Sequence, residues 1–241
     1  MSPRRLNPTE LLEAASVCRD RPAVEAALYL AALEAPGASF EDCAHLGIGQ
    51  RDMALAGLYA ELFGRQLELA ATCPECRARL DVSLSTDALL IEPDPDADPR
   101  IEIGGQRFGV RPADSGDLAA IAAIADSEAA RKQLALRCLA PAEGEHVPDE
   151  LSETEIDAVA AALVAIDPAS DFYVSLSCFQ CKAAWDAPVD IARLLATEIV
   201  IAADTLIDDI HDLALAYHWS EEAILALAPG RRRAYLQRLR G

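Results

Sequence analysis

Two Cys-x-x-Cys pairs that lie far apart in the sequence constrain this chain more than any other feature. The first is Cys73-Pro-Glu-Cys76, the second is Cys178-Phe-Gln-Cys181, and 101 residues separate them. A tetrahedral metal site closed by thiolates needs four sulfurs, and each pair supplies two. If both pairs bind one ion, the fold must place the second pair next to the first, although 101 residues separate them in the sequence.

The residues around the two pairs favour a shared site. The stretches CPECRARLDVSLSTDALL and CFQCKAAWDAPVDIARLL can be aligned over 18 positions, and each has a basic residue after the second cysteine, then an apolar residue before Asp, and a final Leu-Leu. We therefore expect two similar knuckles that face each other, each a tight turn leading into an extended segment. Together they would bind one structural zinc ion per chain through Cys73, Cys76, Cys178 and Cys181. A site closed by four cysteines leaves no position for water or substrate.

Two other uses of these cysteines stay open from the sequence. A redox Cys-x-x-Cys normally opens a helix, whereas the residues after Cys76 alternate like a strand. Ligation of a four-iron cluster is the second alternative. The remaining cysteines, Cys18, Cys43 and Cys138, lie in apolar helical contexts and are expected to be packing residues. Because the total of seven is odd and no secretory signal is visible, a disulfide framework is not expected.

Composition and pattern predict a mainly α protein with small β elements, an α+β fold. Apolar residues make up 52% of the chain but aromatic residues only 5%, which favours close-packed helices. We predict a helical body with a split four-cysteine, zinc-ribbon-like module built from two distant knuckles. The predicted segments are an N-terminal helical region (1–70), the first knuckle (71–91), an insertion with a linker, a β-hairpin and helices (92–170), the second knuckle (171–190), and C-terminal helices with an Arg-rich tail (191–241).

Local signals place several of these elements. Gly104-Gly105 stands between alternating strands and predicts a two-residue hairpin turn. A helical stretch is expected over 117–139, and Ser152 with Glu155 forms a capping box that opens another helix. An apolar stripe over 191–217 predicts a long helix, with a break at His218-Trp219.

The charge balance restricts the partners. There are 21 basic and 40 acidic residues, which gives a net charge of −19 and predicts that nucleic acid is repelled. No apolar run approaches the roughly 18 residues that span a bilayer, so we expect no membrane partner and a cytoplasmic protein. We find no nucleotide-binding loop or catalytic motif, so neither enzymatic activity nor a small-molecule substrate is expected. Asp208 and His211 have the spacing of half a carboxylate-bridged metal site, but a solvated acidic face is the expected outcome.

The C-terminal stretch PGRRRAYLQRLRG carries five arginines and no acidic residue. It invites a helix-turn-helix interpretation, but a lone basic helix on so acidic a body would read DNA poorly. Docking on an acidic protein partner, or on the chain's own acidic surface, is favoured.

The order of these features resembles a known family. A helix ending in LFG precedes TCPEC, a hairpin leads into FGVRPADSGDLAAI, and HDLALAYHWSEEAILALAPGRRRAYL closes the chain. Over about 48–239 this is similar to the baseplate-associated proteins of contractile phage tails and phage-tail-like injection systems, and to baseplate hub assembly proteins of T-even phages. The N-terminal 47 residues lie outside the similarity.

The resemblance implies a non-enzymatic protein that assembles or completes a baseplate or hub and that could be incorporated in the particle. Its partners would be baseplate, hub or spike proteins. The four knuckle cysteines would carry over as metal ligands, and a docking element would comprise Trp219, Ile224, Leu225, Arg232, Arg233 and Tyr235. The alternative is a zinc-ribbon adaptor associated with nucleic acid or the transcription machinery.

Overall fold

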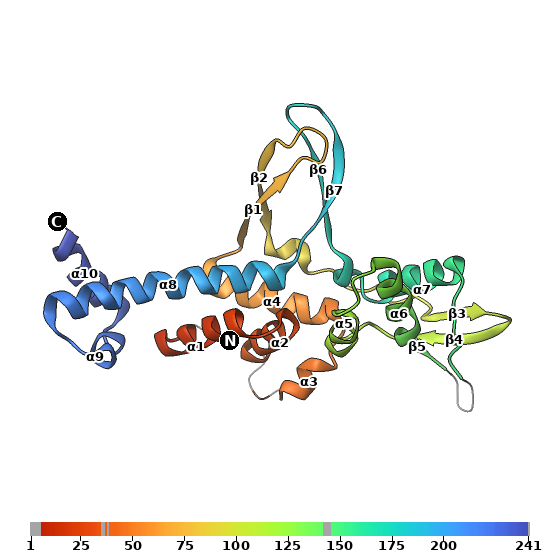
Figure 1. The fold of residues 1–241 in the computed structure, drawn as a ribbon, viewed down its shortest axis with the longest axis horizontal. Coiled ribbons are helices and arrows are strands. Elements are labelled where there is room, and N and C mark those ends of the chain that lie inside the picture. Colours follow the sequence, from red (N-terminus) through yellow and green to blue (C-terminus); the bar gives the residue numbers. More distant parts are fainter. Residues whose placement is uncertain (1–5, 35–36, 38, 142–145, 241) are drawn as a thin grey trace.

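The computed structural model describes residues 6–34, 37, 39–141 and 146–240. Helices make up 57% of the chain and strands 16%, so the α+β fold class is confirmed. The molecule is elongated (Figure 1): a helical body lies in the middle, and an arm of two hairpins projects from its side. A lobe formed by the insertion lies at one end of the long axis, and a lobe formed by the C-terminal residues lies at the other.

The helical body combines the start and the end of the chain. Its helices are α1 (Pro8–Asp20), α2 (Ala23–Glu34), α3 (Phe40–Ala44), α4 (Ile48–Phe63) and the first half of α8 (Ile191–Tyr217). Asn7 and Glu10 form a capping box that starts α1. The side chains of the shared core are mostly small or aliphatic, among them Ala14, Ala15, Leu30, Leu55, Leu58, Ile191, Leu195 and Ile199. The N-terminal and C-terminal helical segments of the sequence prediction therefore form one core rather than two.

The arm consists of two antiparallel hairpins. The first pairs β1 (Gln66–Thr72) with β2 (Arg79–Ser85), and the second pairs β6 (Tyr173–Ser177) with β7 (Ala184–Pro188). Short 3-10 helices adjoin them, η1 (Thr86–Leu89) after β2 and η2 (Pro168–Asp171) before β6. The N-terminal segment expected to be helical over 1–70 is thus helical only as far as Phe63. Gly64, with φ of 96°, ends α4, and strand β1 follows.

The insertion lobe has a core of its own. Its elements are β3 (Arg100–Ile103), β4 (Gln106–Val110), α5 (Ser115–Ile121), α6 (Ser127–Cys138), β5 (Leu139–Ala140) and α7 (Glu153–Ile166). Gly104 and Gly105 both have positive φ, so the predicted hairpin turn is confirmed. The single helical stretch expected over 117–139 is two helices, because the chain turns and Asp126 caps a new one.

The C-terminal lobe begins where α8 ends. His218 adopts a left-handed conformation with φ of 53° and stops the helix at the predicted break. Helices α9 (Glu221–Leu225) and α10 (Pro229–Arg240) then fold back against the end of α8. Within the described residues, no helix is long and apolar enough to cross a membrane.

The insertion lobe is fixed to the body at the start of α4. That helix has no side-chain cap from its own N-cap residue, Gly47. Instead, the backbone N–H of Gly49 donates to the carboxylate of Asp167, at 2.9 Å, and that of Ile48 donates to the carbonyl of Ala113, at 2.9 Å. Asp167 follows α7, so a residue 118 positions away caps α4 and ties the far end of the insertion to the body.

This contact predicts that Gly49→Ala destabilises the fold. An added Cβ would lie 2.0 Å from an oxygen of Asp167 and 2.9 Å from the backbone nitrogen of Ser170. We expect a loss of about 1–3 kcal/mol in the free energy of unfolding, measured by urea titration. Gly57→Ala on the same helix is the control, since its nearest new contact is at 3.6 Å and alanine favours helix. Equal stability of the two variants would contradict the capping role of Asp167.

Candidate metal centre

The two hairpins carry the four cysteines at their tips. In the first hairpin the strand pairing ends at Thr72 and Arg79, and in the second it ends at Ser177 and Ala184. A six-residue loop beginning with the first cysteine closes each hairpin. The tips of the two hairpins come together at the end of the arm farthest from the body (Figure 1). In the described part of the chain, the strands of one hairpin form no ladder with those of the other.

The first knuckle is held by two backbone hydrogen bonds. The N–H of Cys73 donates to the carbonyl of Ala78, at 2.9 Å, and the N–H of Arg77 donates to the carbonyl of Cys73, at 3.0 Å. Arg77 has φ of 63°, a conformation that non-glycine residues rarely adopt. This turn brings both sulfurs of the pair to the same side of the loop.

The second knuckle repeats this geometry. The N–H of Cys178 donates to the carbonyl of Ala183, at 2.8 Å, and the N–H of Lys182 donates to that of Cys178, at 3.0 Å. Lys182 has the same φ as Arg77, 63°. The similarity read from the sequence therefore corresponds to two matching turns, including the basic residue in the left-handed position after each pair. A basic side chain there also partly offsets the negative charge that four thiolates would bring.

The four sulfurs lie together. The Sγ atoms of Cys73 and Cys181 are 3.6 Å apart, and those of Cys76 and Cys178 are 3.5 Å apart. All four lie within 4.8 Å of one another. Thiolates bound at about 2.3 Å around one tetrahedral ion would be about 3.8 Å apart, whereas a disulfide would bring two sulfurs to about 2.05 Å. The donor set fits one metal ion, and all four cysteines are free thiols.

Backbone donors and burial set the protonation of these thiols. Cys73 and Cys178 are buried, and Cys76 and Cys181 are exposed. The backbone N–H groups of Cys181 and Gln180 lower the pKa of the Cys178 thiol to about 6. At Cys76 an N–H from Ala78 favours the thiolate, but desolvation and the neighbouring thiols raise the pKa to about 12. Because a metal ion binds thiolates, it would displace the protons that these sulfurs retain, and binding should strengthen as the pH rises.

The cluster is chemically a closed site. Each of the four residues offers one sulfur, and four sulfurs would fill all the positions around one tetrahedral ion. Among the described residues, no other group of three or more Cys, His, Asp or Glu side chains converges in this way. Asp208 and His211 accordingly lie on the exposed side of α8, as expected from the sequence.

The residues of the predicted docking element lie together in the C-terminal lobe. Ile224 is fully buried with Leu213 and Leu236, while Trp219 and Tyr235 pack against this cluster. Leu225 and Arg232 are half-buried, and Arg233 is exposed. Much of the apolar part of this element is therefore used within the chain.

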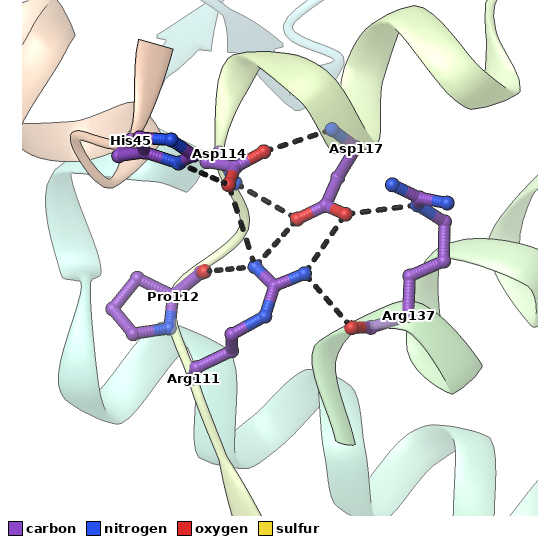
Figure 2. Close-up of polar contacts among 6 residues, drawn as sticks. All are labelled: His45, Arg111, Pro112, Asp114, Asp117 and Arg137. Carbon is purple, nitrogen blue, oxygen red and sulfur yellow. Dashed lines mark hydrogen bonds and ion pairs between the residues drawn. The ribbon is translucent and has the colours of Figure 1, made fainter. Parts of the chain in front are cut away.

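The sequence interpretation missed an ionic cluster within the insertion lobe. Figure 2 shows Asp117, which is completely buried, between two arginines. Arg111 donates to both of its oxygens, at 2.7 and 3.0 Å, and Arg137 donates at 2.8 Å. The N–H of Asp114 donates to it at 3.0 Å, and His45 of the body lies 3.9 Å from Asp114. Burial by itself would raise the pKa of Asp117, but these donors hold it below its ordinary value.

The Asp114–Asp117 spacing is a capping box that opens α5, and it is visible in the sequence. Its arginine partners lie just after β4 and on α6, so only the tertiary fold shows that this carboxylate joins three parts of the lobe.

The ionic cluster predicts a large effect of Asp117→Asn. The substitution removes the charge that two guanidinium groups share, so we expect the free energy of unfolding to fall by about 2–4 kcal/mol in urea titrations. Asp157→Asn is the matched control, because Asp157 pairs with Arg131 at an exposed site. Asp157→Asn should lower the free energy of unfolding by less than about 1 kcal/mol. A similar loss of unfolding free energy in both variants would contradict a structural role for the buried carboxylate of Asp117.

Comparisons with known proteins do not place this chain in a family. No protein-family model, no curated protein and no solved structure matches it. The candidate site therefore depends on its own geometry.

The geometry predicts that metal removal destabilises the fold through these four cysteines. A chelator should lower the melting temperature of the wild type by on the order of 10 °C, because an ion bound to the four sulfurs would hold the two hairpins together. Cys178→Ser should melt at this lower temperature without chelator and respond no further to it. Cys138→Ser, which changes a buried cysteine outside the cluster, should keep the chelator response. Chelator sensitivity that persists in Cys178→Ser would contradict the assignment of the ligands.

Proposed function

We propose that this chain is a non-enzymatic structural protein in which one zinc ion, bound by Cys73, Cys76, Cys178 and Cys181, joins two hairpins into a zinc-ribbon-like arm. The observation that carries the proposal is the convergence of two matching knuckles, whose closest sulfurs lie 3.5 and 3.6 Å apart. Four thiolates in a tetrahedron suit zinc or iron. A four-iron cluster places each thiolate on a different iron and needs sulfurs spread more widely, so the short distances favour a single zinc ion.

We further propose that the protein serves in the baseplate or hub of a contractile phage tail or a tail-like injection system. The support is the sequence resemblance over about 48–239 together with the shape of the molecule. The arm, the insertion lobe and the C-terminal lobe point in different directions from one body (Figure 1), so several neighbours could be contacted at once. The partners would be baseplate, hub or spike proteins.

The C-terminal lobe is the proposed docking element within this role. Of its six residues, Trp219, Ile224 and Tyr235 shape the lobe from inside, and Arg233 lies on its surface. Leu225 and Arg232 are half-buried. Contact with a partner would therefore involve the exposed members, positioned by the buried ones.

The test is to tag the chain in its native host and follow it through purification of tail-like particles and their assembly intermediates. We expect it to co-purify with baseplate or hub proteins, to contain one zinc per chain by elemental analysis, and to be required for complete particles. Normal particles in a deletion strain, with the chain absent from every intermediate, would contradict the assembly role. A zinc-containing chain that instead co-purifies with nucleic acid or RNA polymerase would favour the adaptor function.

A further inference from the structure

Helix α10 carries more positive charge than its described carboxylate partners on α8, Asp209 and Asp212, can neutralise. Helix α10 contains five arginines and no carboxylate, whereas the whole chain has 21 basic and 40 acidic residues. The lobe lies at one end of the long axis, away from the insertion lobe and its acidic linker (Figure 1). Helix α10 is therefore a basic element on an acidic protein.

The apolar side chains of this lobe are already in contact with each other. Leu213, Ile224 and Leu236 are buried together. The rings of Tyr217 and Trp219 stack with centroids 4.8 Å apart, and Tyr235 meets both edge-on at 5.5 and 4.9 Å. These contacts hold α10 against α8, so what the helix presents outward is mainly its arginines.

Four of these five arginines have no carboxylate partner among the described residues, and all of the four except Arg232 are exposed. Arg240 lies 3.6 Å from Asp209 and 3.3 Å from Asp212 on α8. Arg231, Arg233 and Arg238 are exposed and lie within 4.0 Å of no described carboxylate. Elsewhere in the described chain nine of twelve arginines form an ion pair: Arg19, Arg21, Arg51, Arg65, Arg79, Arg100, Arg111, Arg131 and Arg137. Unpaired arginines are thus concentrated on α10.

The helix arranges the arginines in two rows. Arg231 and Arg238 are seven residues apart and share one side of the helix, as do Arg233 and Arg240. Between the rows run Gly230, Ala234 and Gln237, at the spacing of one helix face. Gly230 has no side chain and that of Ala234 is small, so a partner surface could approach that part of the strip closely while guanidinium groups flank it on both sides.

The three arginines at the start of α10 reduce the stability of this helix. Arg231, Arg232 and Arg233 stand near the N-terminus of α10, where no acidic residue is present and the helix dipole is already positive. Each such charge therefore disfavours the helix. The side chain of Arg232 turns inward, and its Nη1 is buried without a hydrogen-bond partner. Local features that oppose stability are typical of surfaces kept for function.

We propose that the arginine face of α10, formed by Arg231, Arg233 and Arg238, binds a carboxylate-rich surface of a protein partner. The inference rests on the proposed assembly function and names the chemistry of the partner there. A local patch of Asp and Glu would fit α10, which is about 18 Å long. Duplex DNA carries a charge about every 1.7 Å and continues past the helix, so it would be repelled by the acidic body.

The test uses the full chain and a fluorescein-labelled octaglutamate peptide, with binding followed by anisotropy at about 0.1 M salt. We expect salt-sensitive binding to the wild type that weakens about tenfold or more in Arg231→Glu/Arg238→Glu. Arg107→Glu/Arg193→Glu is the control, since both residues are exposed arginines without a described carboxylate within 4.0 Å and the change in net charge is identical. This control should bind within about twofold of the wild type.

A stability measurement separates an interface from a structural role. Glutamate at position 231 suits a helix N-terminus, so the melting temperature of Arg231→Glu/Arg238→Glu should not fall. If it does fall, Arg231→Gln/Arg238→Gln must show the same selective loss of peptide binding in a folded protein. Equal weakening by the α10 and control variants, or no peptide binding at all, would overturn the proposal.

Two further outcomes would assign the surface to another occupant and overturn the proposal. One is tighter binding of a 20-base-pair duplex than of the peptide, and the other is self-association in sedimentation that the α10 substitutions abolish. The peptide assay needs no tail-like particle. If the chain binds the peptide but is found in no particle, the assembly function alone is refuted. If the chain is a particle component but does not bind the peptide, this inference alone is refuted.

Discussion

The contact between the two cysteine knuckles is the constraint on which the rest of this structure depends. Each hairpin by itself is a two-stranded ribbon, which is marginal in water, and in the described chain no ladder connects the two. Joining Cys76 to Cys178 closes a loop of 101 residues, at an entropic cost of about 4–5 kcal/mol. Structural zinc sites contribute about 10–16 kcal/mol, so a zinc ion bound to these thiolates would outweigh that cost. The insertion is then fixed at two places. One is the pair of knuckles at the tip of the arm, and the other is the contact of Asp167 with the first turn of α4.

Helix α8 connects the arm, the helical body and the C-terminal lobe. Its 27 residues span about 40 Å, beginning directly after the second hairpin and ending in the C-terminal lobe. The first half completes the core of the N-terminal helices, and Leu213 near its end anchors α9 and α10. One helix thus follows the arm directly and also supports the helix that carries the arginine face. The left-handed residue His218 marks where this rigid element stops.

The sequence predicted the parts of the fold that depend on local chemistry. The 18-position similarity of the knuckles, the Gly104-Gly105 turn, the Ser152 capping box and the break at His218 all arise from short stretches of chain, and the structure confirms them. Contacts between distant elements could not be read in this way. Examples are the cap that Asp167 provides for α4, the two arginines around Asp117, and the pairing of N-terminal helices with α8 in one core. Strand β1 was also missed, because the helical pattern of the first 63 residues masked the alternation that follows Gly64.

The central claim is that one metal ion is bound by four sulfurs drawn equally from the two knuckles. X-ray absorption at the zinc edge of the purified full-length chain tests it most directly, because the spectrum reports the identity and distance of the atoms around the ion. The account predicts a single shell of four sulfurs at about 2.3 Å and no iron scatterer. A shell containing nitrogen or oxygen ligands, a metal–metal distance typical of an iron–sulfur cluster, or a chain purified without metal and with four reactive thiols would contradict it.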